Sequence, residues 1–273
     1  MAKVFIDGSA GTTGLRIHDR LAGRTDIELM LLSDELRKDV DARRKMLNAA
    51  DIVFLCLPDV AAIESVGLIE NKNTAVIDTS TAHRTNDAWV YGFPELSGAY
   101  EKIKNSKRIA NPGCHASGVV ALVAPLVEKG IISKDICLSA FSLTGYSGGG
   151  KKMIAEYEDL ELDMLYNAPR MYGITQKHKH LPEIVKVCGI NTAPVFCPIV
   201  APYYSGMEVS IPLHAKDING NIDDIRKVYH EYYTSGLVSF KEEADEGGFM
   251  SACAYEDRDD MEVTVAEMMR EYC

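Results

Sequence analysis

The chain has 273 residues, of which 47% are hydrophobic and 25% are charged; at about 150 residues per domain, this predicts a globular protein of two domains. The formal net charge of −11 excludes a nucleic acid as the main partner, because phosphates repel an acidic protein. No stretch approaches the roughly 18 uncharged apolar residues of a membrane helix, and the N-terminus does not read as a signal peptide.

Strand and helix patterns alternate over the first third of the chain. Short apolar runs predict strands, and stretches with helical spacing predict the helices between them. In chain order these are a strand at residues 3–8, a helix at 13–22, a strand at 27–32, a helix at 34–48, a strand at 52–57, a helix at 59–70 and a strand at 75–77. Continuous apolar strands alternating with helices predict an α/β domain with a doubly wound, Rossmann-type parallel sheet.

The pattern changes after Ile109. An apolar helix is expected at residues 116–129, and longer strands are expected at 136–144 and 194–213. Long strands with few crossover helices predict an α+β domain whose sheet is mostly antiparallel. We therefore expect a first domain at residues 1–112 and a second domain at residues 113–273.

A glycine-rich loop lies directly between the first strand and the first helix. Its glycines have the spacing G-x-x-G-x-x-G, a variant of the dinucleotide fingerprint, in which the backbone turns tightly and its N–H groups face a pyrophosphate. The alternative is a tight turn that binds nothing. The predicted cofactor-binding residues of this loop are Gly8, Ser9, Ala10, Gly11, Thr12, Thr13 and Gly14.

The residues after the second strand bear on the choice between NADP and NAD. Ser33 followed by Arg37 and Lys38 suits a ribose 2′-phosphate, whereas Asp34 would suit the free 2′-hydroxyl of NAD. Arg37 and Lys38 could equally lie on a solvated helix face. We expect NADP, bound in part by Ser33 and Arg37.

Cys114 differs from the other six cysteines, most of which lie in apolar runs. The odd count and the absence of C-x-x-C pairs predict reduced thiols in a cytoplasmic protein. Pro112 and Gly113 end the preceding strand, so Cys114 falls in the first turn of the apolar helix. A helix N-terminus favours the thiolate, which is the nucleophilic form, although a structural cysteine is the alternative.

The segment at residues 177–183 contains two histidines, two lysines and a glutamate. Histidine exchanges protons near neutral pH, and a carboxylate can orient its ring. His178, His180 and Glu183 are therefore candidate catalytic residues. A charged surface loop is one alternative, and an H-x-H metal pair is another; because no second Cys/His cluster stands out, we predict no metal site.

Two polar loops add candidate substrate-binding residues. The first follows the predicted strand at residues 136–144, where glycines, serine and lysines suit a phosphate or carboxylate cradle. The second follows the fourth strand, at the sheet edge where ligands collect, and its arginine could clamp a carboxylate; a flexible loop and a surface ion pair are the alternatives. With Asn111, these candidates are Ser80, His83, Arg84, Ser147, Gly148 and Lys151.

With these segments in order, the chain resembles the N-acetyl-gamma-glutamyl-phosphate reductases, in the shorter of that family's two types. The resemblance rests on six runs in the family's order, which span most of the chain: residues 8–14, 78–84, 92–96, 111–114, 144–151 and 178–183. Aspartate-semialdehyde dehydrogenases share the layout, but their usual patterns around the cysteine and the histidine are absent.

The resemblance implies an NADPH-dependent reductase of arginine biosynthesis. Cys114 would attack the acyl phosphate and form a thioester, which hydride transfer would reduce to N-acetylglutamate semialdehyde. His180, oriented by Glu183, is the favoured proton donor, with His178 close behind it. The family also implies a small-molecule substrate and a homodimer or homotetramer formed through the second domain.

One feature of the family is missing. Its members continue past the last strand with an Asp-Asn-Leu-Gly-Lys-Gly segment and a helix that returns to the nucleotide domain, and residues 260–273 lack that motif. This predicts either a truncated, catalytically silent dinucleotide-binding protein or a site completed by a partner chain. A related acyl-phosphate reductase and a thiol hydrolase are further alternatives, although the glycine loop disfavours the hydrolase.

Overall fold

The computed structural model describes residues 1–159, 161, 163–234, 236–244 and 246–267, so Cys273 lies outside the described residues. The chain divides into two compact units. The first contains Met1–Phe93 and Gly98–Gly113, and the second contains Pro94–Ser97 and the described residues from Cys114 onward. The expected boundary at residues 112 and 113 had placed Pro94–Ser97 in the first domain, whereas their contacts place them in the second unit. One such contact joins the Glu95 carboxylate to the backbone N–H of Leu237 at 2.8 Å.

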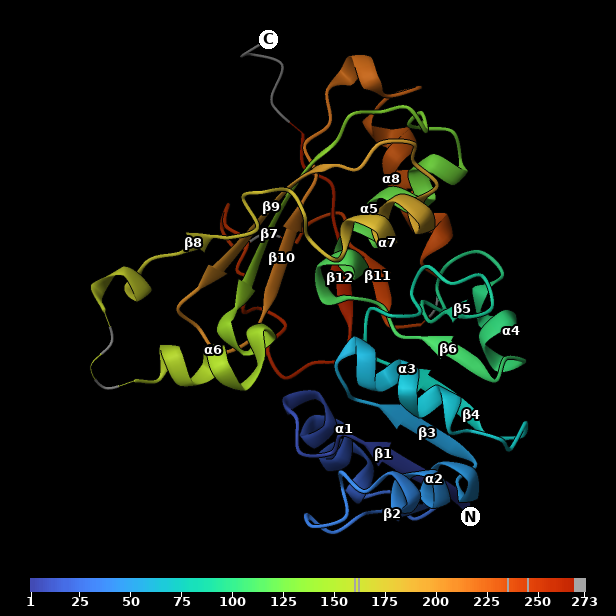
Figure 1. Ribbon diagram of the computed structural model, residues 1–273. Helices are drawn as coiled ribbons and strands as arrows, with labels where there is room; N and C mark the ends of the chain where they lie inside the picture. Colours follow the sequence, from blue (N-terminus) through green and yellow to red (C-terminus); the bar gives the residue numbers. More distant parts are fainter. Residues whose placement is uncertain (160, 162, 235, 245, 268–273) are drawn as a thin grey trace. The chain divides into compact units, whose positions relative to one another are not determined.

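The first unit is built on a six-stranded sheet in the order β2-β1-β3-β4-β6-β5, in which every pairing is parallel (Figure 1). Its strands are β1 (Ala2–Asp7), β2 (Ile27–Met30), β3 (Ile52–Leu55), β4 (Ala75–Asp78), β5 (Val90–Tyr91) and β6 (Arg108–Ala110). Its helices are α1 (Thr12–Ala22), α2 (Val40–Ala49), α3 (Asp59–Gly67) and α4 (Ala99–Lys104). The doubly wound parallel sheet predicted from the sequence is confirmed.

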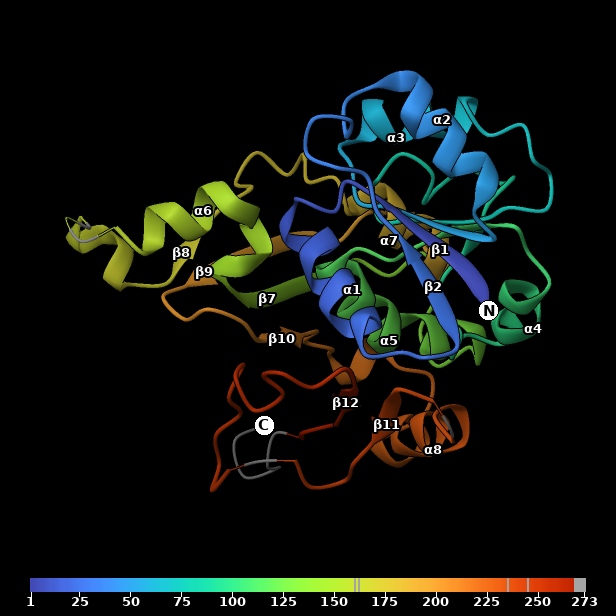
Figure 2. The same ribbon diagram turned by 90° about the horizontal axis from the view of Figure 1, so that it is seen from below.

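Helices cover both faces of this sheet. Phe5, Val53 and Val76 from three strands pack with Leu47 of α2 and Ala62 of α3 in one buried cluster. The two helices therefore lie on the same face, and α1 lies on the other (Figure 2). Apolar side chains on both sides of the strands explain why β1 and β3 are continuous apolar runs.

A buried ion pair fixes the end of β1. The Asp7 carboxylate accepts a hydrogen bond from Arg43 Nη2 at 3.1 Å and one from Ser65 Oγ at 2.9 Å. A buried carboxylate needs such partners, because an unpaired charge in the interior is strongly destabilising. Arg43 lies in α2 and Ser65 lies in α3, so the Asp7 carboxylate joins both helices to the strand that runs into the glycine loop.

The helix expected at residues 34–48 is shorter than predicted. Residues 34–38 form turns, and α2 begins only at Val40. The Asp39 side chain accepts a hydrogen bond from the backbone N–H of Ala42 at 2.7 Å, so it caps the helix. Aspartate competes for backbone donors in this way and favours the position just before a helix over one inside it.

The second unit has a four-stranded sheet in the order β10-β7-β9-β8 and a separate parallel pair, β11 with β12. Its strands are β7 (Ser139–Gly145), β8 (Arg170–Met171), β9 (Val195–Ala201), β10 (Met207–Ser210), β11 (Val238–Phe240) and β12 (Met261–Val263). Its helices are α5 (Cys114–Glu128), α6 (Gly150–Tyr157), α7 (Leu181–Cys188) and α8 (Ile222–Tyr232), with 3₁₀ turns η1 (Tyr146–Gly149), η2 (Met164–Asn167) and η3 (Ala215–Asp217).

The four-stranded sheet is mixed. The outer pairings, β10 with β7 and β8 with β9, are antiparallel as expected, whereas the long central pairing of β7 with β9 is parallel. The single strand expected at residues 194–213 is wrong, because β9 and β10 are separate strands joined by a turn. Pro202 lacks the N–H that would extend β9, and Gly206 adopts a φ of +126°, which only glycine accommodates readily.

Helix α5 is the buried centre of the second unit. It is apolar nearly all round, and it packs against α7, α8 and β10. A helix without a polar face is stable in water only when neighbours cover every side. The approach to the sheet is close: a Cβ added at Gly118 would lie 2.5 Å from Val209 Cγ2. None of the described helices has the length and apolar character needed to span a membrane.

A proline interrupts the hydrogen bonding of α5. Pro125 has no N–H, so the carbonyl of Ala121 loses its partner within the helix. The hydroxyl of Tyr233 donates to this carbonyl at 2.6 Å, and the hydroxyl of Tyr229 donates to that of Leu122 at 2.5 Å. Both tyrosines come from α8 or its end, so the bond that Pro125 removes is replaced by one that attaches α8 to α5.

We predict that Tyr233→Phe lowers the free energy of unfolding by about 1–3 kcal/mol, because it leaves the buried Ala121 carbonyl without a donor. Urea denaturation of the two proteins measures the difference. In a Pro125→Ala background the helix supplies its own N–H, so Tyr233→Phe should cost less there. An equal loss in both backgrounds would contradict this account of α5.

Candidate functional site

Cys114 is the first residue of α5. It is exposed, in contrast to the apolar residues that follow it, and it forms no disulfide. The N–H groups in the first turn of a helix have no partners within the helix, and their partial positive charge favours a thiolate over a thiol. The position predicted from the Pro112–Gly113 break is therefore the one that suits a nucleophilic cysteine.

The next residue, His115, points into the protein. Its side chain is 3% exposed, and both ring nitrogens are bonded: Nδ1 with Ser142 Oγ at 2.6 Å and Nε2 with the hydroxyl of Tyr172 at 2.6 Å. Burial, helped by the neighbouring His178 and Lys179, lowers the pKa of His115 to about 4. The imidazole is therefore neutral at physiological pH, with one N–H and one lone pair.

The loop between β8 and α7 carries the other polar side chains. The backbone N–H of Tyr172 donates to the carbonyl of Pro198 at 3.0 Å. Gln176 then pairs with Phe196 of β9 twice, because its side-chain amide donates to the Phe196 carbonyl and accepts from the Phe196 N–H, each at 2.8 Å. These bonds hold the loop along β9 and set the position of the two histidines that follow.

Three imidazoles lie close together at this point. The ring centroid of His178 is 4.7 Å from that of His180 and 5.8 Å from that of His115, and the centroids of His115 and His180 are 5.7 Å apart. Among the residues that the structure describes, no group of three or more His, Cys, Asp or Glu side chains could hold a metal ion.

The backbone distinguishes the two predicted catalytic histidines. The N–H of His180 donates to Nδ1 of His178 at 3.2 Å, so neutral His178 carries its proton on Nε2. Burial and the charge of Lys179 lower the pKa of His178, which keeps it neutral at pH 7. His178 is half-buried, whereas His180, the residue before α7, is buried. His178 therefore suits a hydrogen-bond donor through Nε2, and the choice of the histidine that exchanges a proton stays a prediction.

Glu183 lies in the first turn of α7, three residues after His180, and its side chain is almost completely buried. A carboxylate is stabilised at a helix N-terminus by the helix dipole. The position in the same turn agrees with the predicted orientation of His180 by Glu183, which stays a prediction.

In the first unit, the glycine loop has the close packing that a dinucleotide fingerprint requires. Gly8 has a φ of +91°, and a Cβ there would lie 2.4 Å from the carbonyl oxygen of Cys56. A Cβ at Gly14 would lie 2.3 Å from the carbonyl oxygen of Gly8, so α1 begins very close to the loop. Gly11 precedes α1, and no side chain caps this helix start in the described structure. The residues present therefore fit a pyrophosphate at the start of α1.

Ser33 and Arg37, the residues expected near the ribose, lie after β2 in an exposed turn rather than on a helix. Arg37 forms an exposed ion pair with Asp34 at 3.5 Å. Such a pair is weak in water, so a phosphate could replace Asp34 as the partner of Arg37.

The loop after β4 is held in place by contacts among its own side chains. The Asp78 carboxylate accepts hydrogen bonds from the Ser80 hydroxyl at 2.7 Å and lies 2.6 Å from His83 Nδ1, and the His83 ring stacks on Trp89. Arg84 is buried and donates to the carbonyls of Thr79 and Asn111, each at 2.9 Å. These bonds fix the position of the Arg84 side chain, and the carboxylate clamp expected from the sequence stays a prediction.

The remaining candidates lie in two places. Asn111 belongs to the first unit and is exposed. Ser147 and Gly148 lie in η1, and Lys151 lies in the first turn of α6, exposed to solvent. Cys114, His178 and His180 thus all belong to the second unit, whereas Ser80, His83, Arg84 and Asn111 belong to the first unit.

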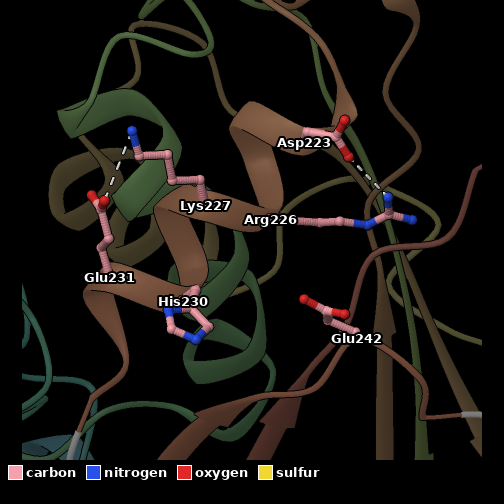
Figure 3. A pocket seen from close by; sticks show the side chains of 6 residues that line it. All are labelled: Asp223, Arg226, Lys227, His230, Glu231 and Glu242. Atoms are coloured by element: carbon pink, nitrogen blue, oxygen red, sulfur yellow. Dashed lines mark hydrogen bonds and ion pairs between the residues drawn. The ribbon is translucent and has the colours of Figure 1, made fainter.

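A shallow pocket of about 290 Å³ lies on α8, and none of the predicted site residues line it (Figure 3). Its lining residues are all titratable: Asp223, Arg226, Lys227, His230, Glu231 and Glu242. Arg226 pairs with Asp223 at 3.2 Å, and Lys227 pairs with Glu231 at 4.0 Å. The three carboxylates outnumber the arginine and the lysine here, which is unsuited to a phosphorylated substrate.

Sequence reasoning missed His115, Tyr172 and Ser142. His115 follows Cys114 directly, but it opens an apolar helix and gave no sign of a polar role. Tyr172 and Ser142 are 57 and 27 residues away from His115 along the chain. Only the pairing of β7 with β9 and the course of the loop bring them together, so no local pattern could have found them.

Two family models match the chain. One, described as the NAD binding domain of semialdehyde dehydrogenases, matches residues 3–106, and the other, described as their dimerisation domain, matches residues 114–267. Among solved structures, aspartate semialdehyde dehydrogenase II from Vibrio cholerae is similar with a TM-score of 0.69 over 97% of this chain and 88% of that chain. Its sequence identity is 15%, so this likeness shows the fold.

Curated proteins share more of the sequence. An N-acetyl-gamma-glutamyl-phosphate reductase from Sinorhizobium medicae is 42% identical over 86% of this chain and 78% of that protein. One from Trichormus variabilis is 40% identical over 92% of this chain and 82% of that protein, and one from Chelativorans sp. is 49% identical over 78% and 68%. The chain therefore belongs to the N-acetyl-gamma-glutamyl-phosphate reductase family, within the semialdehyde dehydrogenases.

Proposed function

We propose that the protein reduces N-acetyl-gamma-glutamyl phosphate to N-acetylglutamate semialdehyde with NADPH, as a step of arginine biosynthesis. The observation that carries this proposal is the exposed thiol of Cys114 at the start of α5, in one unit with the imidazoles of His178 and His180. Relatives that are 40–49% identical bear the name of this activity. Membership of the family's shorter type stays a prediction.

The proposed reaction begins at Cys114. Its thiolate attacks the acyl carbon, the C–O bond to phosphate breaks, and phosphate leaves with the bonding electrons, so that a thioester joins the substrate to Cys114. The nicotinamide, when bound, supplies a hydride to the thioester carbon. The resulting thiohemiacetal then releases the aldehyde as the C–S bond breaks and the Cys114 thiolate re-forms.

The two histidines take different parts in this proposal. Nε2–H of His178 donates a hydrogen bond to the substrate oxygen, which gains negative charge when the thiolate attacks and again when hydride arrives. His180 donates a proton to that oxygen in the thiohemiacetal and takes it back as the aldehyde forms. Glu183, in the same helical turn, is the residue proposed to orient His180.

The first unit is proposed to hold NADP through its glycine loop, Gly8–Gly14. Backbone N–H groups at the start of α1 bind the pyrophosphate, and Ser33 and Arg37 bind the 2′-phosphate. The proposed substrate-binding residues are Ser80, His83, Arg84, Asn111, Ser147, Gly148 and Lys151.

An uncovered apolar surface supports the proposal of a homodimer or homotetramer. Along β7 and β9, alternate residues point to opposite faces: Ala140 and Phe196 are buried, whereas Phe141 and Val195 are exposed. Exposed apolar residues grouped on a sheet are typical of a protein interface. The match to a dimerisation domain over residues 114–267 agrees with this proposal.

We also propose that the protein works in the cytoplasm. Six of its cysteines, all within the described part of the chain, are in the reduced form. Thiols are kept reduced in that compartment, and the proposed mechanism needs Cys114 as a thiolate.

Replacing Cys114 with serine should reduce turnover by about 10³-fold or more, because a serine hydroxyl is not ionised at neutral pH. The assay is phosphate-dependent reduction of NADP with N-acetylglutamate semialdehyde, the reverse reaction. The affinity for NADP, measured by calorimetry, should stay within a few fold. Cys137→Ser, which changes another exposed cysteine of the second unit, is the matched control.

Turnover that survives in Cys114→Ser would refute the thioester. A wild-type protein that binds NADP but shows neither turnover nor a thioester would instead indicate the catalytically silent protein considered from the sequence.

The two histidines are separated by glutamine substitutions, because the glutamine amide donates a hydrogen bond but exchanges no proton. His178→Gln should keep kcat/KM within about tenfold of the wild type, whereas His180→Gln should lose about 10²–10⁴-fold. Since the pKa of His178 lies below its usual 6.5, its protonation should reduce wild-type activity only in more acidic solution. The opposite order of the two losses would exchange the proposed roles.

Arg37→Ala should weaken NADP binding by about tenfold and leave NAD binding unchanged, because NAD lacks the 2′-phosphate that Arg37 is proposed to bind. Calorimetry with each dinucleotide measures both affinities. Arg44→Ala is the matched control, since Arg44 forms a similar exposed pair with Asp41 at 2.8 Å three residues away on α2. An equal effect on NADP and NAD would mean that Arg37 does not select the cofactor.

A further inference from the structure

Ser142, His115 and Tyr172 form a continuous chain of hydrogen bonds beside the start of α5. Ser142 Oγ, in β7, lies 2.6 Å from His115 Nδ1, and His115 Nε2 lies 2.6 Å from the hydroxyl of Tyr172. Ser142 is 0% exposed and His115 is 3% exposed, whereas Tyr172 is half-buried. These hydrogen bonds therefore run from the buried interior of the unit to the half-buried hydroxyl of Tyr172.

We propose that this chain is a relay that ends on the thiolate of Cys114, and that Tyr172 is the positioning residue that holds the thiolate by donating its hydroxyl proton. The relay rests on the proposed function for its role in turnover, but it acts on the thiol itself and can be tested without substrate.

The neutral state of His115 limits the relay to two directions. A neutral imidazole has one N–H and one lone pair, so it donates to one neighbour and accepts from the other. Either Ser142 donates to Nδ1 and Nε2–H donates to Tyr172, or Nδ1–H donates to Ser142 and Tyr172 donates to Nε2. The first direction leaves the Tyr172 proton for a further acceptor, and the second leaves the Ser142 proton for one.

The burial of Ser142 selects the first direction. In the described part of the chain, His115 Nδ1 is the hydrogen-bond partner of Ser142 Oγ, and the serine is sealed from solvent. A buried hydroxyl that donates to nothing costs about 1–3 kcal/mol. Ser142 therefore donates to His115, and His115 donates to Tyr172. The Tyr172 hydroxyl can then donate its proton to an acceptor other than Ser142 and His115.

We propose Cys114 as that acceptor. Cys114 directly precedes His115 in α5, so the thiol lies one residue along the chain from the imidazole that binds Tyr172. Burial raises the pKa of Tyr172, and the negative charge of the Cys114 thiolate raises it further, which places the two groups within electrostatic reach. Tyr172 thus keeps its proton at neutral pH and can donate it in a hydrogen bond, which favours the charged form of the sulfur.

Other ionisable groups lie near His115. The rings of His178 and His180, from the loop and the start of α7, lie beside the His115 ring, and the charge of Lys179 also acts on His115. Lys179 is the same in every variant below. Because none of these groups is altered by substitution at Tyr172 or Ser142, a shift in the ionisation of Cys114 would report on the relay.

The test is the pH dependence of alkylation of Cys114 by iodoacetamide, read by mass spectrometry of the Cys114 peptide so that the other cysteines do not contribute. In Tyr172→Phe, we expect the midpoint to rise by about one pH unit, which makes alkylation at pH 7 about tenfold slower. Ser142→Ala should shift it in the same direction by less, because Nδ1 loses its donor and Nε2 can then accept the Tyr172 proton. Ser142→Thr, which keeps the hydroxyl, should restore the wild-type midpoint.

Tyr229→Phe is the matched control, because the Tyr229 hydroxyl also donates to α5, at the carbonyl of Leu122. It should lower the melting temperature and leave the alkylation midpoint of Cys114 unchanged. A folded Tyr172→Phe with the wild-type midpoint would overturn the relay, and so would a Ser142→Ala protein whose midpoint does not move.

These outcomes are separate from the fate of the proposed function. A protein that shows the expected shifts but does not turn over N-acetylglutamate semialdehyde would keep the relay and refute the substrate. A protein with normal turnover and no shift in the alkylation midpoint would keep the proposed substrate and refute the relay.

Discussion

The buried imidazole of His115 is the contact on which the polar side chains of the second unit depend. It joins α5 to β7 through Ser142 and to the loop after β8 through Tyr172. Because burial keeps its pKa near 4, His115 stays neutral across the physiological range and both bonds persist. A protonated imidazole would have two donors and no acceptor, so the Ser142 hydroxyl could no longer donate to it.

Side chains also replace backbone partners that the fold removes. The Tyr233 hydroxyl bonds to the Ala121 carbonyl that Pro125 deprives of its helical partner, and Gln176 pairs with Phe196 as a neighbouring strand residue would. Buried backbone groups need such partners, so each replacement also fixes where a segment lies. The first attaches α8 to α5, and the second holds the loop that carries the histidines. The position of these histidines beside His115 therefore follows from hydrogen bonds made by residues that take no part in the proposed chemistry.

The features that could be predicted from the sequence are the local ones. The glycine spacing of Gly8–Gly14 and the break before Cys114 depend on residues within one turn of each other, and the alternation of strands and helices predicted the parallel sheet. The split between β9 and β10 was missed because the apolar residues of β9 and the alternating residues of β10 both fit a strand, and only Pro202 and Gly206 mark the turn. The role of Arg84 stays a prediction: an arginine after a strand suits an anion, and here two of its donors bind backbone carbonyls, which no local pattern indicates. Contacts between distant segments, such as that of His115 with Tyr172, have no signature in a single sequence.

The pair His178 and His180 shows how identical side chains acquire different hydrogen bonding and burial. With one residue between them, the backbone N–H of the second reaches Nδ1 of the first. This bond stabilises the tautomer of His178 that has its proton on Nε2, and it opposes protonation, because an imidazolium would direct a second N–H at the same donor. His178 is thereby held as a hydrogen-bond donor across neutral pH. A reaction that needs both a donor for a developing negative charge and a group that exchanges a proton is better served by such a pair than by one histidine. A single imidazole would lose its donor each time it gave up its proton.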